Sequence, residues 1–591
     1  MKNSKRALCM ILAISAVCAS FAACARPDDG DTSHLTGNES VLKIGIFDGG
    51  VGHQWAKNIE VAFEKKYANV SFEPGKMGVD VKINAQKEQL SPDQIKASIS
   101  QGQRNNMEDI YYPSDYVGKA FIQNEYILNI SDFLSEKVYL ENGELADMTY
   151  NPVTKKNELN DGATAPTKSI LDKMRSIEAE GYNFSSDTIG GKEAGYYFFP
   201  YESSLSGFVY DHDLFEEQGW LRYGGIDGLP DTMDEFFELL DEIAGSGYIP
   251  FTFSANQAYY YTTGIRRAFI AQYEGYEEAA LNYTYNGVYT FKKGALPDSV
   301  AAEYPENIQK NADGSYTATI TPENAWILTY QPGKEEWIKF AKRLIGDDKR
   351  YIDPDCGKTT MDFTGVQQQF VLSKLEKNGQ KRIAMIYEGE WWENEARDYF
   401  NYTGGYGTRD FRFFPLPQIE GQKDPAVRSV AEYSEDVSGF VNAKTPVPEL
   451  CRLWLQYSHS ESALENFTMQ TGLTMAYDFD LSEEQQGQMS KFARNVYKIK
   501  KQSDYGVTTF RETFNLNAHP FWSFCKSGGF GTEVYSMGCS AVKFGSVDYA
   551  NKFLLKYFYD NPETSAEEYI DGMYNYYTKA NWDAVYKTWL G

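Results

Sequence analysis

Strand-like and helix-like segments alternate near the start of the chain, and this alternation limits the possible folds more than any other feature. Residues 41–47 have the apolar composition of a strand, and residues 55–67 carry apolar side chains at helical spacing. A second strand over 79–83, a helix over 91–99 and a third strand over 109–112 follow. Strands that alternate with helices are typical of a parallel sheet with helices on both faces. We therefore predict an α/β fold.

Polar and aromatic residues follow two of these strands. Ligands of such sheets bind in loops at the carboxyl ends of the strands. The loop after the first strand begins at Asp48 and leads to Trp55, and the third strand is followed by Asp115 after Tyr112. These two loops are therefore candidate ligand loops. A helix N-cap or a solvated loop acid is the alternative role for either Asp.

The stretch 196–215 indicates a crossing between two folded units. An aromatic run ends at Pro200, the polar patch 201–204 follows, and a strand-like apolar run comes next. Glu202 lies in the polar patch, so we expect its carboxylate to face the space between the units. A buried acid at such a crossing needs a partner, which is either a ligand or a structural Arg.

Later segments continue the pattern of strands and helices. Thr232 and Glu235 have the spacing of a capping box and predict a helix that extends to Ala244. Residues 137–192 are polar and only weakly periodic, and residues 273–321 have no helical period. We interpret both as surface insertions, with a hairpin as one form of the second.

Two adjacent tryptophans follow a predicted strand over residues 382–387. The sequence after this strand contains Glu388, Glu390, Trp391 and Trp392. Large apolar side chains are costly to leave in water without use. Packing in a core or between the units is the alternative to ligand contact for at least one of the two.

Length and composition set the broad class. A chain of 591 residues is expected to form two to four domains. The net charge of -26 argues against a nucleic-acid partner, because phosphate binding needs a cationic surface. The 44 Tyr residues suit either the binding of sugar rings or Tyr-rich cores, and composition alone leaves both open.

The N-terminus has the organisation of a secretory signal peptide over residues 1–23. Three basic residues precede the uncharged apolar run 7–23, which is followed by Cys24. The ending FAAC resembles the lipobox of bacterial lipoproteins, in which the Cys is lipidated after cleavage. An ordinary signal peptide cut near Ala23 is the alternative. Residues 24–40 are polar and predict a lipidated tether, and no later stretch reaches 18 uninterrupted apolar residues, so the lipid is the only expected anchor.

These features together resemble the extracellular solute-binding lipoproteins of bacterial ABC importers, in the sugar-binding group typified by maltose-binding protein. The motifs that carry the resemblance, in chain order, are the lipobox, LKIGIFDGG, DIYYPSD, FFPYESSLSGFVYDHDLFEEQGW, PDTMDEFFELL, RIAMIYEGEWW and VSGFVNAKTPVPELCRLWLQYSHSESALENFTMQTGLTMAY. They cover most of the chain after the signal peptide. The two insertions and the total length exceed the usual size of the group.

The resemblance implies a fold of two α/β lobes with a hinge and a ligand cleft between the lobes. Lobe 1 would contain residues 41–201 and 434–481, and lobe 2 would contain residues 202–433 and 482–591. The lobes would close around a carbohydrate, and an ABC permease would recognise the closed form. The protein is therefore expected to be an extracytoplasmic, membrane-anchored monomer that has no cofactor and catalyses no reaction. The insertions and the many aromatic residues favour an oligosaccharide as the ligand. The excess of acidic over basic residues disfavours a polyanionic glycan.

The resemblance also implies a set of sugar-binding residues. Ionised carboxylates accept strong hydrogen bonds from sugar hydroxyls, while the CH face of the ring lies on an aromatic side chain. The positions that match are Asp48, Asp115, Glu202 and Trp391, with Tyr112 as an aromatic in the same loop as Asp115 and Trp392, Trp55 and Tyr433 as weaker candidates.

Two other functions remain open from the sequence. Glu202 with Glu388 or Glu390 would form the paired carboxylates of a secreted glycoside hydrolase if their separation suited one of the two mechanisms. A surface adhesion protein would have no small-ligand cleft. The sequence contains no GxxxxGK[ST], HExxH or GxSxG motif.

A metal site and a disulfide framework have little support. The five His residues are scattered, and Asp353, Asp355 and Gly357 lack the full spacing of a calcium loop. Four internal cysteines remain after Cys24, of which Cys525 and Cys539 could close a short loop. Free thiols at Cys356, Cys451 and these two positions are the alternative.

Overall fold

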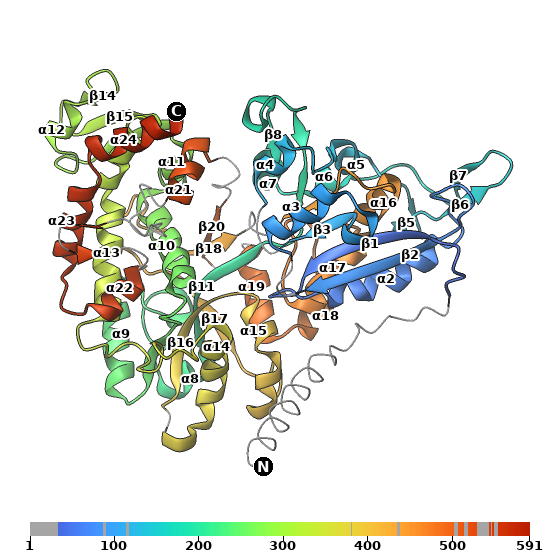
Figure 1. Ribbon diagram of the computed structural model, residues 1–591. Coiled ribbons are helices and arrows are strands. Elements are labelled where there is room, and N and C mark those ends of the chain that lie inside the picture. The colour runs from blue at the N-terminus through green and yellow to red at the C-terminus, as the bar shows by residue number, and fades with distance from the viewer. Residues whose placement is uncertain are drawn as a thin grey trace, which may run out of the picture.

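The computed structural model describes residues 34–86, 90–113, 117–379, 381–433, 438–501, 506–512, 518–528, 543–544, 547–548 and 554–591. Two sheets, each with its own helices, lie side by side and form two lobes (Figure 1). No helix in these ranges is long and apolar enough to cross a membrane.

The sheet of lobe 1 has the strand order β10-β19-β3-β1-β2. Its strands are β1 (Ser40–Phe47), β2 (Val79–Gln86), β3 (Ile110–Tyr112), β10 (Phe198–Pro200) and β19 (Ser438–Val441). Strands β2, β1 and β3 are parallel, as the sequence predicts, whereas β19 and β10 are antiparallel to their neighbours. The antiparallel strands bring in segments from much later in the chain.

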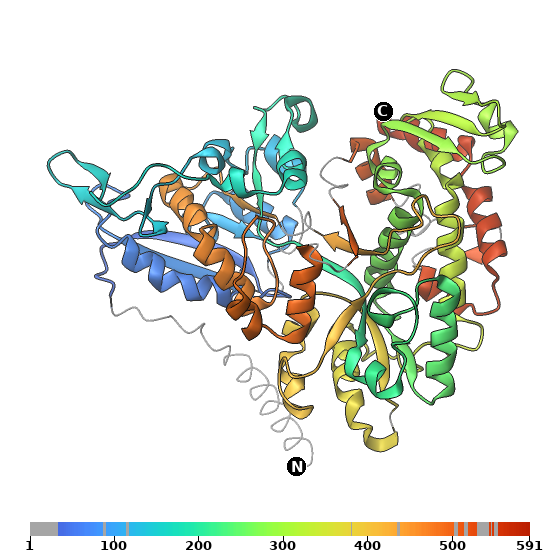
Figure 2. The same ribbon diagram turned by 180° about the vertical axis from the view of Figure 1, so that it is seen from behind.

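Both faces of this sheet are buried, which explains its apolar strands. Strand residues alternate between the faces, so Ile110 and Tyr112 join one hydrophobic cluster while Tyr111 joins another. The helices α2 (Gln54–Lys66), α16 (Pro448–Ser458) and α17 (Glu461–Thr471) contact one another and cover the first of these faces (Figure 2). The other face is covered by helices that include α3 (Pro92–Gln101) and α4 (Lys119–Gln123).

The first predicted insertion, residues 137–192, contributes short antiparallel hairpins to lobe 1. They are β4 (Leu140–Glu141) with β5 (Glu144–Leu145) and β6 (Met148–Asn151) with β7 (Lys156–Leu159). The insertion also contains β8 (Asn183–Phe184), which pairs with β9 (Gly195–Tyr196) just after it. The short helices α5 (Ser131–Ser135) and α6 (Ile170–Lys173) lie beside them.

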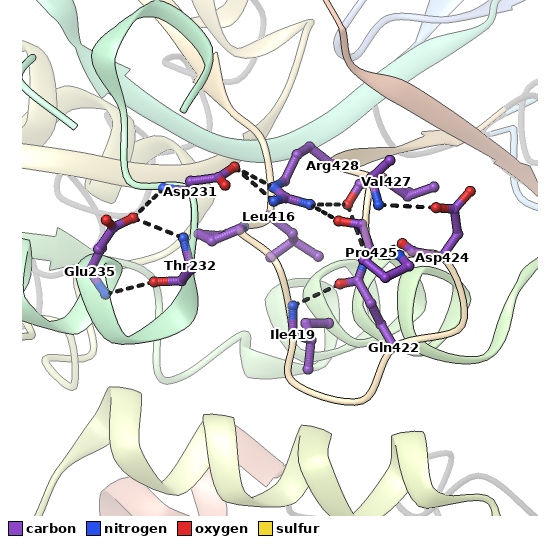
Figure 3. A network of polar contacts seen from close by, with 12 residues as sticks. Asp231, Thr232, Glu235, Leu416, Ile419, Gln422, Asp424, Pro425, Val427 and Arg428 are labelled. Atoms are coloured by element: carbon purple, nitrogen blue, oxygen red, sulfur yellow. Dashed lines mark hydrogen bonds and ion pairs between the residues drawn. The ribbon is translucent and has the colours of Figure 1, made fainter. Parts of the chain in front are cut away.

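Lobe 2 contains a mixed sheet with the strand order β12-β16-β11-β18-β20, and β17 also pairs with β11. The strands are β11 (Ser204–Asp211), β12 (Ile249–Thr252), β16 (Ile383–Gly389), β17 (Phe411–Phe414), β18 (Ser429–Tyr433) and β20 (Thr508–Glu512). All eight residues of β11 are buried, because this central strand is covered on both faces. The polar network of Figure 3 fixes the loop that leads into β18, where Arg428 binds Asp231 Oδ1 through Nε at 2.9 Å and Nη2 at 2.7 Å.

Helices surround this second sheet and extend the lobe outward. They are α8 (His212–Gln218), α9 (Met233–Gly245), α10 (Ala258–Glu274), α11 (Tyr276–Thr284), α13 (Pro332–Ile345) and α14 (Phe363–Leu372), with α21 (Pro520–Gly528), α22 (Leu554–Asp560), α23 (Ala566–Tyr576) and α24 (Lys579–Leu590) near the C-terminus. The predicted capping box of α9 is present, because Thr232 Oγ1 accepts the Glu235 N–H at 3.3 Å and Glu235 accepts the Thr232 N–H at 3.1 Å.

The second predicted insertion, residues 273–321, is only partly irregular. It ends in a three-stranded sheet formed by β13 (Gly287–Phe291), β15 (Tyr316–Ile320) and β14 (Ile308–Lys310). The expectation of no helix here was wrong, because α11 occupies 276–284. Its buried residues include the polar Asn282 as well as Ala279, Leu281 and Tyr283, so the pattern of apolar residues alone did not show the helix.

Helix α19 (Lys491–Lys500) packs against both lobes. Ala493 and Tyr497 belong to the hydrophobic cluster of lobe 1, whereas Phe492, Val496 and Ile499 belong to that of lobe 2. The chain also passes from one sheet to the other between β10 and β11 and between β18 and β19. The two lobes are therefore joined at several points rather than by a single linker.

Candidate functional site

The loop after β1 carries Asp48 to the junction of the lobes. The Asp48 side chain is about one-third exposed, and its Oδ1 lies 2.8 Å from His53 Nδ1. Gly50 and Gly52 have φ values of 54° and 71°, a region that glycine adopts without the cost borne by other residues. The loop can therefore turn tightly before α2 begins at Gln54.

Contacts between this loop and the segment after β16 hold the two lobes together. The Gly50 N–H donates to Glu395 Oε1 at 3.0 Å, and Asn394 Nδ2 donates to the Gly50 carbonyl at 2.9 Å. Both partners belong to α15 (Trp392–Glu395) of lobe 2.

Trp391 lies at the same contact. A methyl group added at Gly50 would meet the Trp391 side chain at 3.5 Å, and one added at Gly389 would overlap the indole ring at 2.2 Å. The half-buried indole therefore lies against Gly389 of its own strand and close to Gly50 of the opposite lobe, where it packs on the core of lobe 1.

Glu202 occupies the crossing between the two sheets, as the sequence predicts. Its side chain is buried, and Oε1 accepts a hydrogen bond from Ser204 Oγ. Burial raises the pKa of Glu202 to about 7, because removal from water disfavours the charged form. The charge of Glu390 acts in the same direction, whereas Lys500 and the bond from Ser204 oppose it.

Lys500, at the end of α19, ties the crossing together. Its ammonium lies 2.7 Å from Glu390 Oε1 and 2.7 Å from Thr474 Oγ1, and it also donates to the Ser203 carbonyl. Glu390 Oε2 in turn accepts the Leu205 N–H at 3.0 Å. One buried ion pair thus connects α19, both lobes and the crossing strand. Sequence reasoning missed Lys500, because nothing in the basic run KIKK distinguishes a buried Lys from a solvated one.

A cavity of about 670 Å³ opens beside the Asp48 loop. Lobe 1 supplies Asp48, Val51, Gly52, His53, Gln54, Trp55, Asn58, Thr468, Met469, Gln470, Thr471 and Gly472. Lobe 2 supplies Asn394, Arg397 and Tyr406. The start of α19 and the residues before it supply Gln488, Met489, Ser490 and Ala493. Cavities of about 300–1,000 Å³ are typical of small-molecule sites. Neither Glu202 nor Trp391 lines this cavity.

Three of the predicted site residues are core residues in this structure. Tyr112 has no exposed surface, its hydroxyl accepts from Trp454 Nε1 at 3.1 Å, and burial raises its pKa. Trp55 is 3% exposed and packs edge-on against Tyr112 and Phe467, so it meets the cavity only at its margin. Trp392 is fully buried among aromatic rings, which are Phe370, Phe400, Phe411 and Phe492.

Other predictions fall where the structure gives no side-chain description. Asp115, Cys24 and Cys539 lie outside the described residues. Tyr433 ends β18 beside the crossing, where its backbone pairs in register with Ser204. Cys356, Cys451 and Cys525 are buried free thiols.

The described residues do not form a metal site. No group of three or more His, Cys, Asp or Glu side chains among them is placed to hold an ion. Asp353 instead binds the Thr252 hydroxyl and the Asp355 N–H, so the loop that faintly resembles a calcium site has a structural role.

The fold is shared with proteins of known structure. No protein-family model and no curated protein matches the sequence. A probable secreted solute-binding lipoprotein from Streptomyces coelicolor aligns with a TM-score of 0.51 at 10% identity, covering 93% of this chain and 100% of that one. A chitin oligosaccharide binding protein aligns with a TM-score of 0.50 at 14% identity, covering 93% and 99%. At these identities the likeness concerns the fold, and the chain has the two-lobed α/β fold of solute-binding proteins that its sequence predicts.

Proposed function

We propose that the protein is a lipid-anchored, extracytoplasmic receptor that binds a carbohydrate between its lobes and delivers it to an ABC permease. The observation that supports this proposal most is the contact between the Asp48 loop of one lobe and the Trp391 segment of the other, in a chain with a solute-binding fold. The chitin oligosaccharide binding protein of the same fold supports a carbohydrate as the ligand.

The chemistry of the junction suits a sugar. Asp48 is about one-third exposed and keeps acceptor capacity beyond its bond to His53. The half-buried indole of Trp391 offers apolar surface to the CH face of a sugar ring. Glu202 is buried in this structure, and we propose that separation of the lobes exposes it to an entering ligand. Asp115 and Tyr433 remain predicted contacts of the same site.

Several parts of the proposal rest on the sequence. Cys24 is the proposed lipidation site, with residues 24–40 as the tether. The proposed lobe boundaries are 41–201 with 434–481 for lobe 1 and 202–433 with 482–591 for lobe 2. We propose that the protein acts as a monomer and that its closed form is the one that the permease recognises.

Thermal unfolding of the chain from residue 25 onward, in the presence of mono- and oligosaccharides, tests the proposal. A ligand that binds only the native state raises the unfolding temperature. We expect a sugar that stabilises the protein and is recovered intact, and we expect Trp391→Ala to remove the effect. Tyr402→Ala is a matched control, because Tyr402 is an aromatic residue of the same lobe that is 68% exposed.

Two results would redirect the assignment. Recovery of a cleaved sugar would favour a glycoside hydrolase that uses Glu202 with Glu388 or Glu390. The absence of any shift across a broad panel would favour a surface adhesion protein or a ligand that is not a sugar.

A further inference from the structure

The cavity beside the Asp48 loop is unusual in its charge. The chain carries 83 acidic residues among 591, yet the cavity is lined by a single acid, Asp48, with His53 and one Arg, Arg397. The other polar lining groups are amides, hydroxyls and backbone. The cavity is therefore formally neutral in a protein with a net charge of -26, and it is neutral because a guanidinium lines it.

Arg397 is held in place without an ion pair. Its guanidinium carbon lies 3.9 Å from the centre of the Tyr406 ring, and Nη2 reaches the Gln470 carbonyl at the long distance of 3.5 Å. Among the described residues, Arg397 forms no ion pair with a carboxylate. The contact with the Tyr406 ring and a hydrogen bond to its side chain hold the guanidinium at the cavity, and part of its five N–H groups is left for another partner.

The nearby carboxyl of Glu393 is not an ion-pair partner of Arg397. Glu393 is buried, and its Oε2 accepts a hydrogen bond from Ser490 Oγ at 2.5 Å. Burial raises the pKa of Glu393 to about 7, while the charge of Arg397 lowers it. The guanidinium therefore acts on Glu393 through space. It also donates to the Gln470 carbonyl and hydrogen-bonds the Tyr406 side chain, and its remaining N–H groups are the donors for a partner in the cavity.

Asp48 and Arg397 come from opposite lobes, so a ligand that contacts both would hold the lobes together. A carboxylate is the group that matches the planar donors of a guanidinium. Sugar hydroxyls would match Asp48 and the amides of Gln54, Asn58, Asn394, Gln470 and Gln488. The volume of about 670 Å³ is large enough for a short oligosaccharide.

We propose that this cavity binds the carboxylate-bearing unit of a glycan, a uronic acid, with its carboxylate on Arg397 and its hydroxyls on Asp48 and the surrounding amides. The inference rests on the proposed function and names the class of its ligand. A single carboxylate fits a neutral cavity, whereas the net charge of -26 opposes a long polyanion.

Calorimetric titration of the chain from residue 25 onward with matched sugar pairs tests this inference. Suitable pairs are galacturonate trimer against galactose trimer, and xylotriose with and without a glucuronic acid branch. We expect at least one acidic member to bind roughly 10- to 100-fold more tightly than its neutral counterpart, as a hydrogen-bonded charge pair would provide. Arg397→Gln should abolish this preference, and Arg397→Lys should retain part of it.

Arg343→Gln is the matched control. The Arg343 guanidinium also lies 3.9 Å from an aromatic ring, that of Phe237, but on a surface of lobe 2 where it pairs with Asp234. The control should leave the preference unchanged. A neutral sugar that binds as tightly as its acidic partner, or a preference that survives Arg397→Gln, would overturn the uronic acid assignment while leaving a sugar receptor intact. Failure of every sugar in both pairs and in the broader panel would overturn both proposals.

Discussion

Replacing Glu202 with Gln should stabilise the protein above pH 7 and change its stability little near pH 4.5. Burial raises the pKa of Glu202 from 4.5 to about 7. Between these values the folded protein binds more protons at this carboxyl than the unfolded chain does. The free energy of unfolding therefore falls as the pH rises, because stability falls wherever the native state holds the extra proton.

The size of the effect follows from the same two pKa values. Each pKa unit corresponds to about 1.4 kcal/mol, so the shift from 4.5 to about 7 amounts to about 3 kcal/mol at most. Glutamine has nearly the same shape, carries no charge and can still accept the bond from Ser204 Oγ. The variant should therefore avoid this loss, and its stability relative to the wild type should rise between pH 4.5 and pH 8.

Urea unfolding of both proteins at a series of pH values measures this difference directly. Other titrating groups, including Glu393 with a pKa raised to about 7, are present in both proteins and cancel in the comparison. A variant that is less stable than the wild type at pH 8 would refute the reasoning. That result would mean that the folded protein stabilises the ionised form of Glu202, for example through a cationic partner.

Three further substitutions test the packing around the junction. Trp392→Ala should lower the free energy of unfolding by about 3–5 kcal/mol, since the indole is fully buried among four Phe rings. Urea unfolding measures this change, and a decrease below about 1 kcal/mol would contradict the observed packing. Lys500→Met should lower the free energy of unfolding by about 3–5 kcal/mol, because it leaves the buried Glu390 carboxylate without its ion-pair partner. The double variant with Glu390→Gln should recover much of this stability, and no recovery would show that the loss does not come from the ion pair. Gly389→Ala should displace the Trp391 indole and weaken sugar binding about as much as Trp391→Ala does, and unchanged binding by calorimetry would place the sugar elsewhere.

Local sequence signals located the strands, the crossing and the helix starts. Asp48 follows β1 and Glu202 lies between the sheets, because the alternation of strands and helices determines which loops end at the junction. The Thr232–Glu235 box is formed by residues three apart, so it could be read directly from the chain.

The side on which an aromatic residue packs could not be read in the same way. Tyr112 and Trp392 were predicted as site residues, yet both are core residues. A large aromatic at a strand end has the same local pattern whether it faces a core or a cleft. Only the tertiary arrangement, such as the hydrogen bond from Trp454 Nε1 to the Tyr112 hydroxyl, distinguishes a core position from a cleft position.

Contacts between distant segments were also beyond the sequence. Lys500 pairs with Glu390 and Arg397 reaches Gln470 across long stretches of chain. Their spacing carries no periodic signal, because such contacts depend on how α19 and α17 pack between the lobes. The cavity and its neutral charge therefore emerged only from the structure.

The most direct test of the central claim is calorimetric titration of the chain from residue 25 onward with a stabilising oligosaccharide, followed by analysis of the recovered sugar. We expect one intact sugar bound per chain, loss of binding in Trp391→Ala and unchanged binding in Tyr402→Ala. Cleavage of the sugar, or equal binding by both variants, would contradict a carbohydrate receptor with its site between the lobes.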